Sequence, residues 1–125
     1  MRLLLDTNAF LWALDDLDRL LPDARTALRS SDNDLFVSMA SLWEIAIKVG
    51  TGKLTAGLDW ESYLPRMGAT LLGIEPAHAR AVADLPLLHR DPFDRMLVAQ
   101  ARIEDLILVT HDRQLADYDI TVLPA

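Results

Sequence analysis

Short apolar runs alternate with segments of helical length along the whole 125-residue chain, and this alternation limits the fold more than any other feature. The first run, Leu3–Leu5, contains no polar position, which predicts a strand buried on both faces of a parallel sheet. Similar runs at residues 35–37, 69–74, 106–109 and 120–123 predict four further strands. Strands separated by helices favour an α/β fold, with helices covering both faces of a mostly parallel sheet of four or five strands.

The segments between the runs carry helical caps and apolar stripes. We expect helices at residues 9–14, 22–29, 39–49, 60–67, 76–84, 92–104 and 113–116. Thr7 or Asn8 is expected to cap the first helix and Ser38 the third. Asp91 followed by Pro92 marks the start of the long helix near the end of the chain. No repeat, low-complexity segment or linker interrupts the sequence, so we expect a single domain over residues 1–125.

The composition excludes several classes of protein. No apolar run approaches the roughly 20 residues that cross a bilayer, and Asp6 interrupts the one candidate for a signal peptide. A cytoplasmic protein without a membrane partner is therefore expected. The absence of cysteine excludes disulfides and thiolate metal sites. A net charge of −7 argues against a protein that coats nucleic acid by neutralising phosphates, but is compatible with a nuclease whose clustered acids bind cations.

Four acids occupy related places beside the expected strands. Asp6 and Asp112 each follow a strand closely. Glu44 lies in the second turn of a helix that follows a strand, and Asp94 lies in the first turn of the helix that leads to another. Because strand carboxyl ends and crossover-helix amino ends share one edge of a parallel sheet, we expect all four carboxylates to meet at that edge.

A group of carboxylates of this kind favours metal-assisted hydrolysis. Their mutual repulsion raises their pKa values unless a cation compensates, and Mg²⁺ and Mn²⁺ prefer oxygen ligands. One or two such ions can activate water and stabilise the oxygens of a phosphodiester under attack. The chain offers no cysteine and no clear Ser-His-acid set as an alternative nucleophile. Thr7, Asn8 and Thr110 are the small polar residues expected to orient the ligands.

Taken singly, the acids have ordinary structural explanations. Glu44 lies four residues before Lys48, the spacing of an exposed ion pair on a helix. Asp94 lies three residues after Asp91, where it would complete a capping box. Asp6 would end its strand and cap the helix after it, and Asp112 would cap the turn that follows it. Only the coincidence of all four acids at one edge favours a metal site.

Basic residues near the same edge are candidates for contacts with substrate phosphates. They are Lys48, Lys53, Arg95 and Arg113. His111, beside Asp112, is a further candidate for contact with substrate or metal, and His89 would contact phosphate or stabilise its own loop. The tryptophans Trp12, Trp43 and Trp60 are expected in the core or in contacts between subunits rather than as platforms for bases.

These segments resemble the PIN-domain toxins of the VapC type. The resemblance rests on the strings LLLDTN, SLWEIAIK, HRDPFDR and VTHD, at residues 3–8, 41–48, 89–95 and 109–112. They occur in the family's order and at its spacing over nearly the whole chain, and WEIAIK and DPFDR are the most specific parts. Asn8 stands where many relatives have histidine, and His111 at a position that varies among them, which bears on substrate preference more than on catalysis.

The resemblance implies a three-layer α/β/α PIN fold and a Mg²⁺-dependent ribonuclease toxin, with Mn²⁺ able to substitute. Such a toxin cuts tRNA or ribosomal RNA and arrests translation. The family's acidic quartet falls on Asp6, Glu44, Asp94 and Asp112. The resemblance further implies a homodimer that is held inactive by a cognate DNA-binding antitoxin.

Two other functions stay open at this point. A PIN-like interaction module without turnover would use the acids for capping and partner binding, although a complete quartet disfavours it. A phosphatase with Asp6 as nucleophile is also conceivable, but that chemistry usually places a second aspartate two residues later, where this chain has Asn8. Dinucleotide binding is excluded because no G-x-G-x-x-G follows any expected strand.

Overall fold

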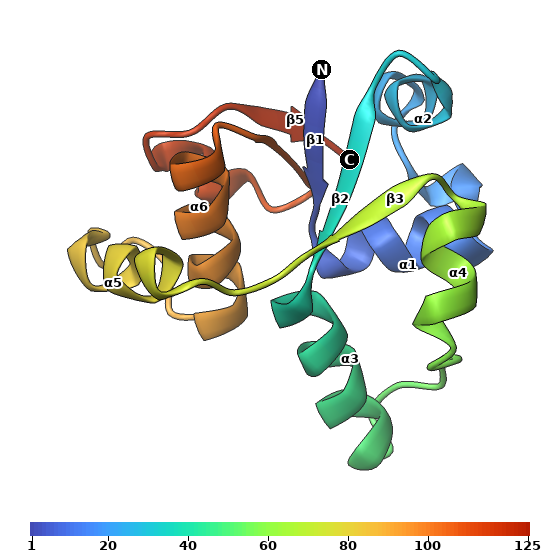
Figure 1. Ribbon diagram of the computed structural model, residues 1–125, viewed down its shortest axis with the longest axis horizontal. Helices are drawn as coiled ribbons and strands as arrows, with labels where there is room; N and C mark the ends of the chain where they lie inside the picture. The colour runs from blue at the N-terminus through green and yellow to red at the C-terminus, as the bar shows by residue number, and fades with distance from the viewer.

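Five parallel strands form one sheet in the order β3-β2-β1-β4-β5 in the structure, a computed structural model that describes residues 1–125 (Figure 1). The strands are β1 (Arg2–Leu5), β2 (Asp34–Ser38), β3 (Ala69–Leu72), β4 (Ile107–Thr110) and β5 (Val122–Pro124). The helices are α1 (Thr7–Asp15), α2 (Pro22–Arg29), α3 (Met39–Gly50), α4 (Trp60–Arg66), α5 (Pro76–Asp84) and α6 (Pro92–Glu104), with short 3-10 turns η1 (Leu17–Arg19) and η2 (Arg113–Asp117). The expected α/β architecture is confirmed, and every strand pair is parallel.

The central strand β1 explains why the chain opens with consecutive leucines. Successive side chains of a strand point to opposite faces of the sheet. Leu3 and Leu5 belong to one apolar core, whereas Leu4 belongs to the core on the opposite face, and all three are fully buried. Because β1 is flanked by β2 and β4, both its edges and both its faces are covered. The Asp6 backbone is therefore held at a well-fixed point.

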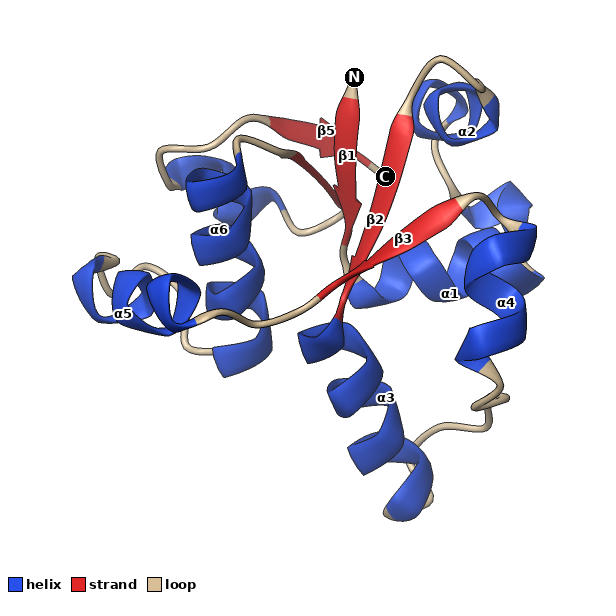
Figure 2. Cartoon of the chain, in the orientation of Figure 1, coloured by secondary structure: helices blue, strands red, loops and turns tan.

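Helices cover both faces of the sheet, which makes three layers (Figure 2). Residues of α1, α2 and α4 pack in the core that contains Leu3 and Leu5, and residues of α5 and α6 pack in the core that contains Leu4. Helix α3 contributes to both cores, with Ala40 on one side and Ile45 on the other. It extends beyond the carboxyl edge of the sheet in the view of Figure 2.

Three details differ from the sequence-based expectation. The cap of α1 is Asp6 rather than Thr7 or Asn8, because the Asp6 carboxylate accepts the Ala9 N–H at 2.8 Å and the helix already begins at Thr7. Strand β3 ends at Leu72, where the register pairs it with Ser38, the last residue of β2. Strand β5 starts two residues later than expected, at Val122.

The expected caps of two other helices are confirmed. Ser38 accepts the Ala40 N–H and also donates to Gln100 at 2.5 Å, which ties the start of α3 to α6. Asp91 accepts the N–H groups of Phe93 and Asp94 at the start of α6. No helix of the protein has both the length and the apolar character that crossing a membrane requires.

Candidate active site

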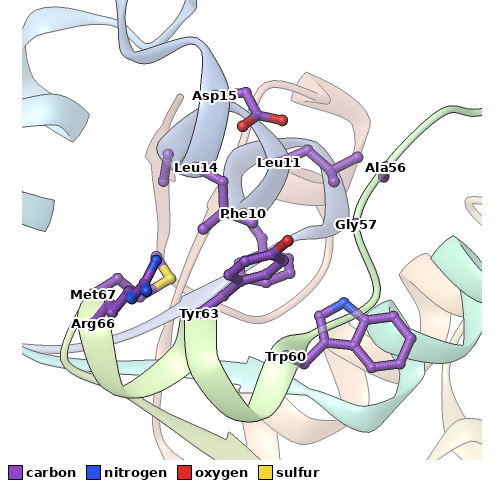
Figure 3. A pocket seen from close by; sticks show the side chains of 11 residues that line it. Phe10, Leu11, Leu14, Asp15, Ala56, Gly57, Trp60, Tyr63, Arg66 and Met67 are labelled. Carbon is purple, nitrogen blue, oxygen red and sulfur yellow. The ribbon is translucent and has the colours of Figure 1, made fainter.

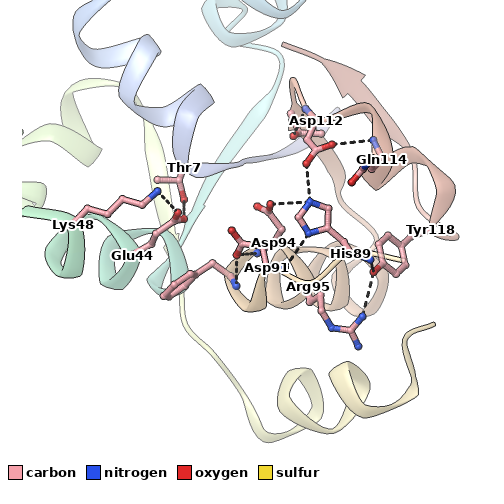
Figure 4. Close-up of polar contacts among 12 residues, drawn as sticks. Thr7, Glu44, Lys48, His89, Asp91, Asp94, Arg95, Asp112, Gln114 and Tyr118 are labelled. Carbon is pink, nitrogen blue, oxygen red and sulfur yellow. Dashed lines mark hydrogen bonds and ion pairs between the residues drawn. The ribbon is translucent and has the colours of Figure 1, made fainter. Parts of the chain in front are cut away.

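The four acids meet in one polar cleft of about 240 Å³ at the carboxyl edge of the sheet. No hydrophobic residue lines it. The lining residues are Asp6, Thr7, Asn8, Glu44, Lys48, His89, Asp91, Asp94, His111 and Asp112. Figure 4 shows how side chains from α1, α3, α6 and the segment after β4 converge on this space. The geometric expectation for the quartet therefore agrees with the structure.

Asp6 lies at the bottom of the cleft and is buried. Its carboxylate accepts the Ala9 N–H at 2.8 Å, and the Thr110 side chain is a further hydrogen-bonding neighbour. Burial raises the pKa of Asp6, and nearby Glu44 adds to this, whereas Thr110, the Ala9 N–H and His111 oppose it. A carboxylate in this state gains from a nearby cation.

Glu44 is held by two donors from different helices. The Thr7 hydroxyl donates to Oε1 at 2.6 Å, and the Lys48 ammonium donates to Oε2 at 2.7 Å. The ion pair with Lys48 exists as the spacing suggested, but Glu44 is buried and faces the cleft rather than solvent. The hydrogen bond to Glu44 raises the pKa of Lys48, and the charges of Asp91 and Asp94 add to this effect.

Asp94 is the carboxylate with the fewest partners. Its side chain accepts no hydrogen bond, and its Oδ2 lies 3.7 Å from His89 Nε2. The capping box suggested by the sequence is not formed, because the Asp91 N–H donates to His89 Nδ1 at 3.1 Å instead. Burial, together with the charges of Asp91 and Asp6, raises the pKa of Asp94 to about 7.

Asp112 is fixed at both carboxylate oxygens. Oδ1 accepts the Gln114 N–H at 3.0 Å, so Asp112 caps the turn η2 as expected. Oδ2 lies 2.8 Å from His89 Nε2. The Asp112 N–H in turn donates to the Thr110 hydroxyl at 3.1 Å, which gives Thr110 a positioning contact beneath the cleft.

The residues present fit a divalent cation. All four acids supply oxygen, the ligand type that Mg²⁺ and Mn²⁺ prefer. Asp6 and Asp94 are the two acids whose pKa is raised, and the negative charge of Asp6 contributes to the raised pKa of Asp94. These two residues would hold the ion directly, and Glu44 and Asp112 are each held in place by two hydrogen bonds. Lys48, the cationic residue of the lining, is already paired with Glu44.

The basic candidates are distributed unevenly around this cleft. Lys48 and His111 line it, and the His111 ring lies 5.1 Å from the Trp12 ring. Arg113 is exposed just after Asp112, outside the lining. Arg95 points away, because its guanidinium donates to the carbonyls of residues 82, 85 and 86 and to the Tyr118 hydroxyl. This placement does not favour Arg95 as a phosphate contact.

Two residues matter more in the cleft than the sequence indicated. Asp91 was explained by capping alone, yet it also lines the cleft and raises the pKa of Asp94. His89 bridges the space between Asp94 and Asp112. Neither role could be found from periodicity, because both depend on how the loop between α5 and α6 folds back over the cleft.

A second hollow, of about 400 Å³, lies between α1 and α4 (Figure 3). Eight of its eleven lining residues are hydrophobic, among them Phe10, Trp60 and Met67. Its charged side chains are Asp15 and Arg66, so it lacks the grouped carboxylates of the first cleft. The polar cleft is therefore the candidate active site.

Comparison with known proteins identifies the family. The model of the PIN domain family matches residues 3–120, and the chain therefore belongs to the PIN domain family. No curated protein matches the sequence significantly.

Solved structures of similar fold are toxin–antitoxin complexes. VapBC2 from Rickettsia felis, bound to a DNA fragment from the promoter, matches with a TM-score of 0.75 at 16% identity and covers 100% of this chain and 99% of that one. DNA-bound VapBC from Salmonella typhimurium matches with a TM-score of 0.68 at 14% identity, and the match covers 99% of this chain and 98% of that one. A toxin–antitoxin complex from Klebsiella pneumoniae matches with a TM-score of 0.64 at 19% identity, and the match covers 98% of this chain and 97% of that one. At these identities the likeness shows the fold, which confirms the PIN architecture expected from the sequence.

Proposed function

We propose that the protein is a metal-dependent endoribonuclease toxin. The observation that carries this proposal is the meeting of Asp6, Glu44, Asp94 and Asp112 in a cleft without any hydrophobic lining residue, at the ligand-binding edge of a PIN fold. The toxin–antitoxin complexes among the similar structures support the toxin assignment. RNA as substrate follows from the resemblance to VapC-type toxins.

The side chains of the cleft have different roles in this proposal. A bound Mg²⁺, or Mn²⁺ in its place, would supply activation of water and stabilisation of charge on the phosphate oxygens. Asp6 and Asp94 would hold the ion through their carboxylates. Thr7 and Lys48 orient Glu44 by holding both of its carboxylate oxygens.

Substrate contacts come from the rim of the cleft. Lys48 is half-exposed and keeps donors free beyond its bond to Glu44, so it can meet a phosphate. Asn8, His111 and Arg113 are exposed beside the acids, where they can contact the neighbouring nucleotides. We propose tRNA or ribosomal RNA in the cytoplasm as the target, and arrest of translation as the result.

A cognate antitoxin is the proposed protein partner. The similar structures from Rickettsia felis and Salmonella typhimurium contain VapB and VapC together on DNA. An antitoxin that binds DNA and covers the acidic cleft would hold this chain inactive. A homodimer is the proposed form of the toxin itself.

An exposed apolar stripe on α3 supports the homodimer. Met39, Trp43 and Ile47 lie four residues apart, so they share one face of the helix. Their exposed fractions are 40%, 60% and 42%. Two further exposed apolar residues are Leu71, which lies in β3, and Ile74, which lies just after it. Trp43 is therefore not a core residue of one subunit, which favours the contact between subunits that the sequence left as an alternative.

Cleavage of RNA with purified protein tests the proposal. Wild type should cut RNA in Mg²⁺ or Mn²⁺ and stop when EDTA is added, and Asp6→Asn and Asp94→Asn should lose this activity by about a hundredfold or more. Asp117→Asn, an exposed acid at the end of η2, is the matched control. Sequencing of the RNA ends after brief expression would name the target.

Three outcomes would overturn the proposal. Unchanged cleavage by Asp6→Asn or Asp94→Asn would show that the quartet is not the active site. Absence of both cleavage and Mn²⁺ binding would favour a non-catalytic interaction module. A phosphoryl group trapped on Asp6 would favour a phosphatase.

A further inference from the structure

We propose that His89 is a positioning residue that holds Asp112 in place as a hydrogen-bond donor and does not itself bind the metal. This inference rests on the proposed function, since it concerns the same cleft. His89 lies on the loop between α5 and α6, and its side chain is 15% exposed. Its ring faces two carboxylates, with Nε2 2.8 Å from Asp112 Oδ2 and 3.7 Å from Asp94 Oδ2.

The backbone of the loop decides which ring nitrogen carries the proton. The Asp91 N–H donates to His89 Nδ1 at 3.1 Å. A nitrogen that accepts a hydrogen bond carries no proton, so the proton of the neutral ring is on Nε2. The Nε2–H then donates to Asp112. The tautomer thus follows from a contact between residues two positions apart in the chain.

This tautomer opposes direct metal binding by the ring. Ligand atoms of His89, Asp94 and Asp112 lie within 4.8 Å of one another, a spacing that a metal ion can bridge. A histidine ligand needs a lone pair toward the ion, but the lone pair of Nδ1 faces the Asp91 N–H and Nε2 carries the proton. The ring therefore acts on the neighbouring carboxylate, as donors behind metal ligands commonly do.

Asp112 is then held from two sides. The Gln114 N–H fixes Oδ1 and the His89 ring fixes Oδ2. Two donors on different oxygens restrict rotation of the carboxylate, so they hold Asp112 in one orientation toward the cleft. Loss of one donor frees that rotation, and outer contacts of this kind typically change metal affinity by about 10- to 100-fold.

Further contacts hold the His89 loop itself. The His89 N–H donates to the Tyr118 hydroxyl at 3.0 Å, and the Arg95 guanidinium donates to the same hydroxyl at 3.2 Å. Arg95 also binds the carbonyls of Leu85 and Pro86, which begin the loop. Figure 4 shows Arg95 and Tyr118 on the side of His89 away from Glu44. Arg95 thus supports the position of the ring rather than contacting the cleft.

Long-range ¹H–¹⁵N correlation spectra of the histidine rings test the tautomer directly. We expect His89 to give the Nε2–H pattern in the metal-free protein and to keep it after addition of Mg²⁺, which is diamagnetic. A change to the Nδ1–H pattern on addition of Mg²⁺ would show that Nε2 binds the ion, and would overturn the inference.

Two substitutions separate the donor from the acceptor. In His89→Gln the longer side chain places an amide N–H near the position of Nε2, so the donor to Asp112 is kept. In His89→Asn the shorter side chain keeps only an acceptor near the position of Nδ1, so the donor to Asp112 is lost. Calorimetric titration with Mn²⁺ should show about a tenfold or greater loss of affinity in His89→Asn and much less in His89→Gln. Similar melting temperatures for the two variants would separate positioning from folding. Equal affinities in the two variants would overturn the inference.

A double-mutant cycle shows whether His89 acts through Asp112. In the Asp112→Ala background, His89→Asn should cause no further loss of Mn²⁺ affinity. Additive losses would show that His89 acts on something else, and would overturn the inference. Absence of Mn²⁺ binding in the wild type would instead reject the proposed function, so the two failures are distinguishable.

Discussion

Asp94 and Asp6 differ from the other acids of the cleft in what their oxygens contact. Glu44 and Asp112 have both carboxylate oxygens in hydrogen bonds, whereas the Asp94 carboxylate has none. The Asp6 carboxylate accepts the Ala9 N–H and has the Thr110 side chain beside it. The same two residues are those whose pKa is raised, first of all by burial. The site therefore keeps two carboxylates poorly compensated, a state that a bound cation would relieve.

Asp94→Asn should stabilise the metal-free protein while abolishing tight Mn²⁺ binding. At about pH 8 the carboxylate of Asp94 is ionised beside Asp6 and Asp91, and the neutral amide removes this repulsion. We expect a gain of about 1 kcal/mol in the free energy of unfolding, modest because the side chain is partly exposed and screened. Urea unfolding in EDTA measures the gain, with Asp117→Asn as the control. A loss of stability would contradict the pKa assignment.

Asp94 should make the free energy of unfolding fall as the pH rises, which is the opposite of what an ordinary carboxylate with a lowered pKa does. The folded-state pKa of Asp94, about 7, lies above the ordinary value of 3.8, so the folded protein binds more protons than the unfolded chain between these pH values. The contribution of Asp94 to stability is therefore present at low pH and is lost as the pH rises through about 7. Asp94→Asn should remove this part of the pH dependence when unfolding in EDTA is compared between about pH 5 and pH 8.

Metal affinity should change with pH in the opposite direction. A cation binds the ionised carboxylate, so Mn²⁺ affinity should rise as the pH approaches about 7 and level off above it. Calorimetric titrations at several pH values check this. A flat profile would mean that Asp94 is ionised throughout the range.

At the scale of secondary-structure elements, caps and site residues are often the same side chains. Asp6 caps α1, Asp112 caps η2 and Asp91 caps α6, and all three line the cleft. This follows from the position of helix amino ends at the carboxyl edge of a parallel sheet. Capping was thus a valid structural explanation for these acids, and it does not exclude a place in the site.

Arg95 and Arg113 should respond differently to substitution. Arg95→Ala removes donors from three carbonyls and from the Tyr118 hydroxyl, so we expect a loss of about 2 kcal/mol in the free energy of unfolding. Arg113→Ala, exposed beside Asp112, should change stability by less than about 0.5 kcal/mol but raise the KM for RNA. Urea unfolding and cleavage kinetics measure the two effects. A stable Arg95→Ala with a raised KM would restore Arg95 as a phosphate contact.

At the scale of the whole molecule, the exposed stripe on α3 predicts the oligomeric state. Ile47→Lys places a charge within this apolar stripe and should shift the proposed dimer to monomer in sedimentation experiments. Its melting temperature as a monomer should change little, because Ile47 is exposed on the single subunit. Ile103→Lys, an exposed apolar residue of α6, is the matched control. A dimer that survives Ile47→Lys would place the subunit contact elsewhere.

Hydrophobic periodicity and the alternation of strands with helices were sufficient to predict the architecture and the edge at which the acids meet. Leu3–Leu5 specified a doubly buried strand, and the parallel arrangement then brought Asp6, Glu44, Asp94 and Asp112 to one place. This much is accessible from the sequence because it depends on the direction of each element and on which end of it a residue occupies, not on side-chain conformation.

The tertiary structure alone decided where the Arg95 guanidinium points and which carboxylate the His89 ring contacts. Each depends on contacts between residues far apart in the chain, such as His89 with Asp112 and Arg95 with Tyr118. The loop between α5 and α6 carries no periodic pattern, so its path over the cleft follows from packing against α6 and η2. For that reason the sequence indicates which residues surround the site, whereas the contact that each side chain makes there depends on the tertiary structure.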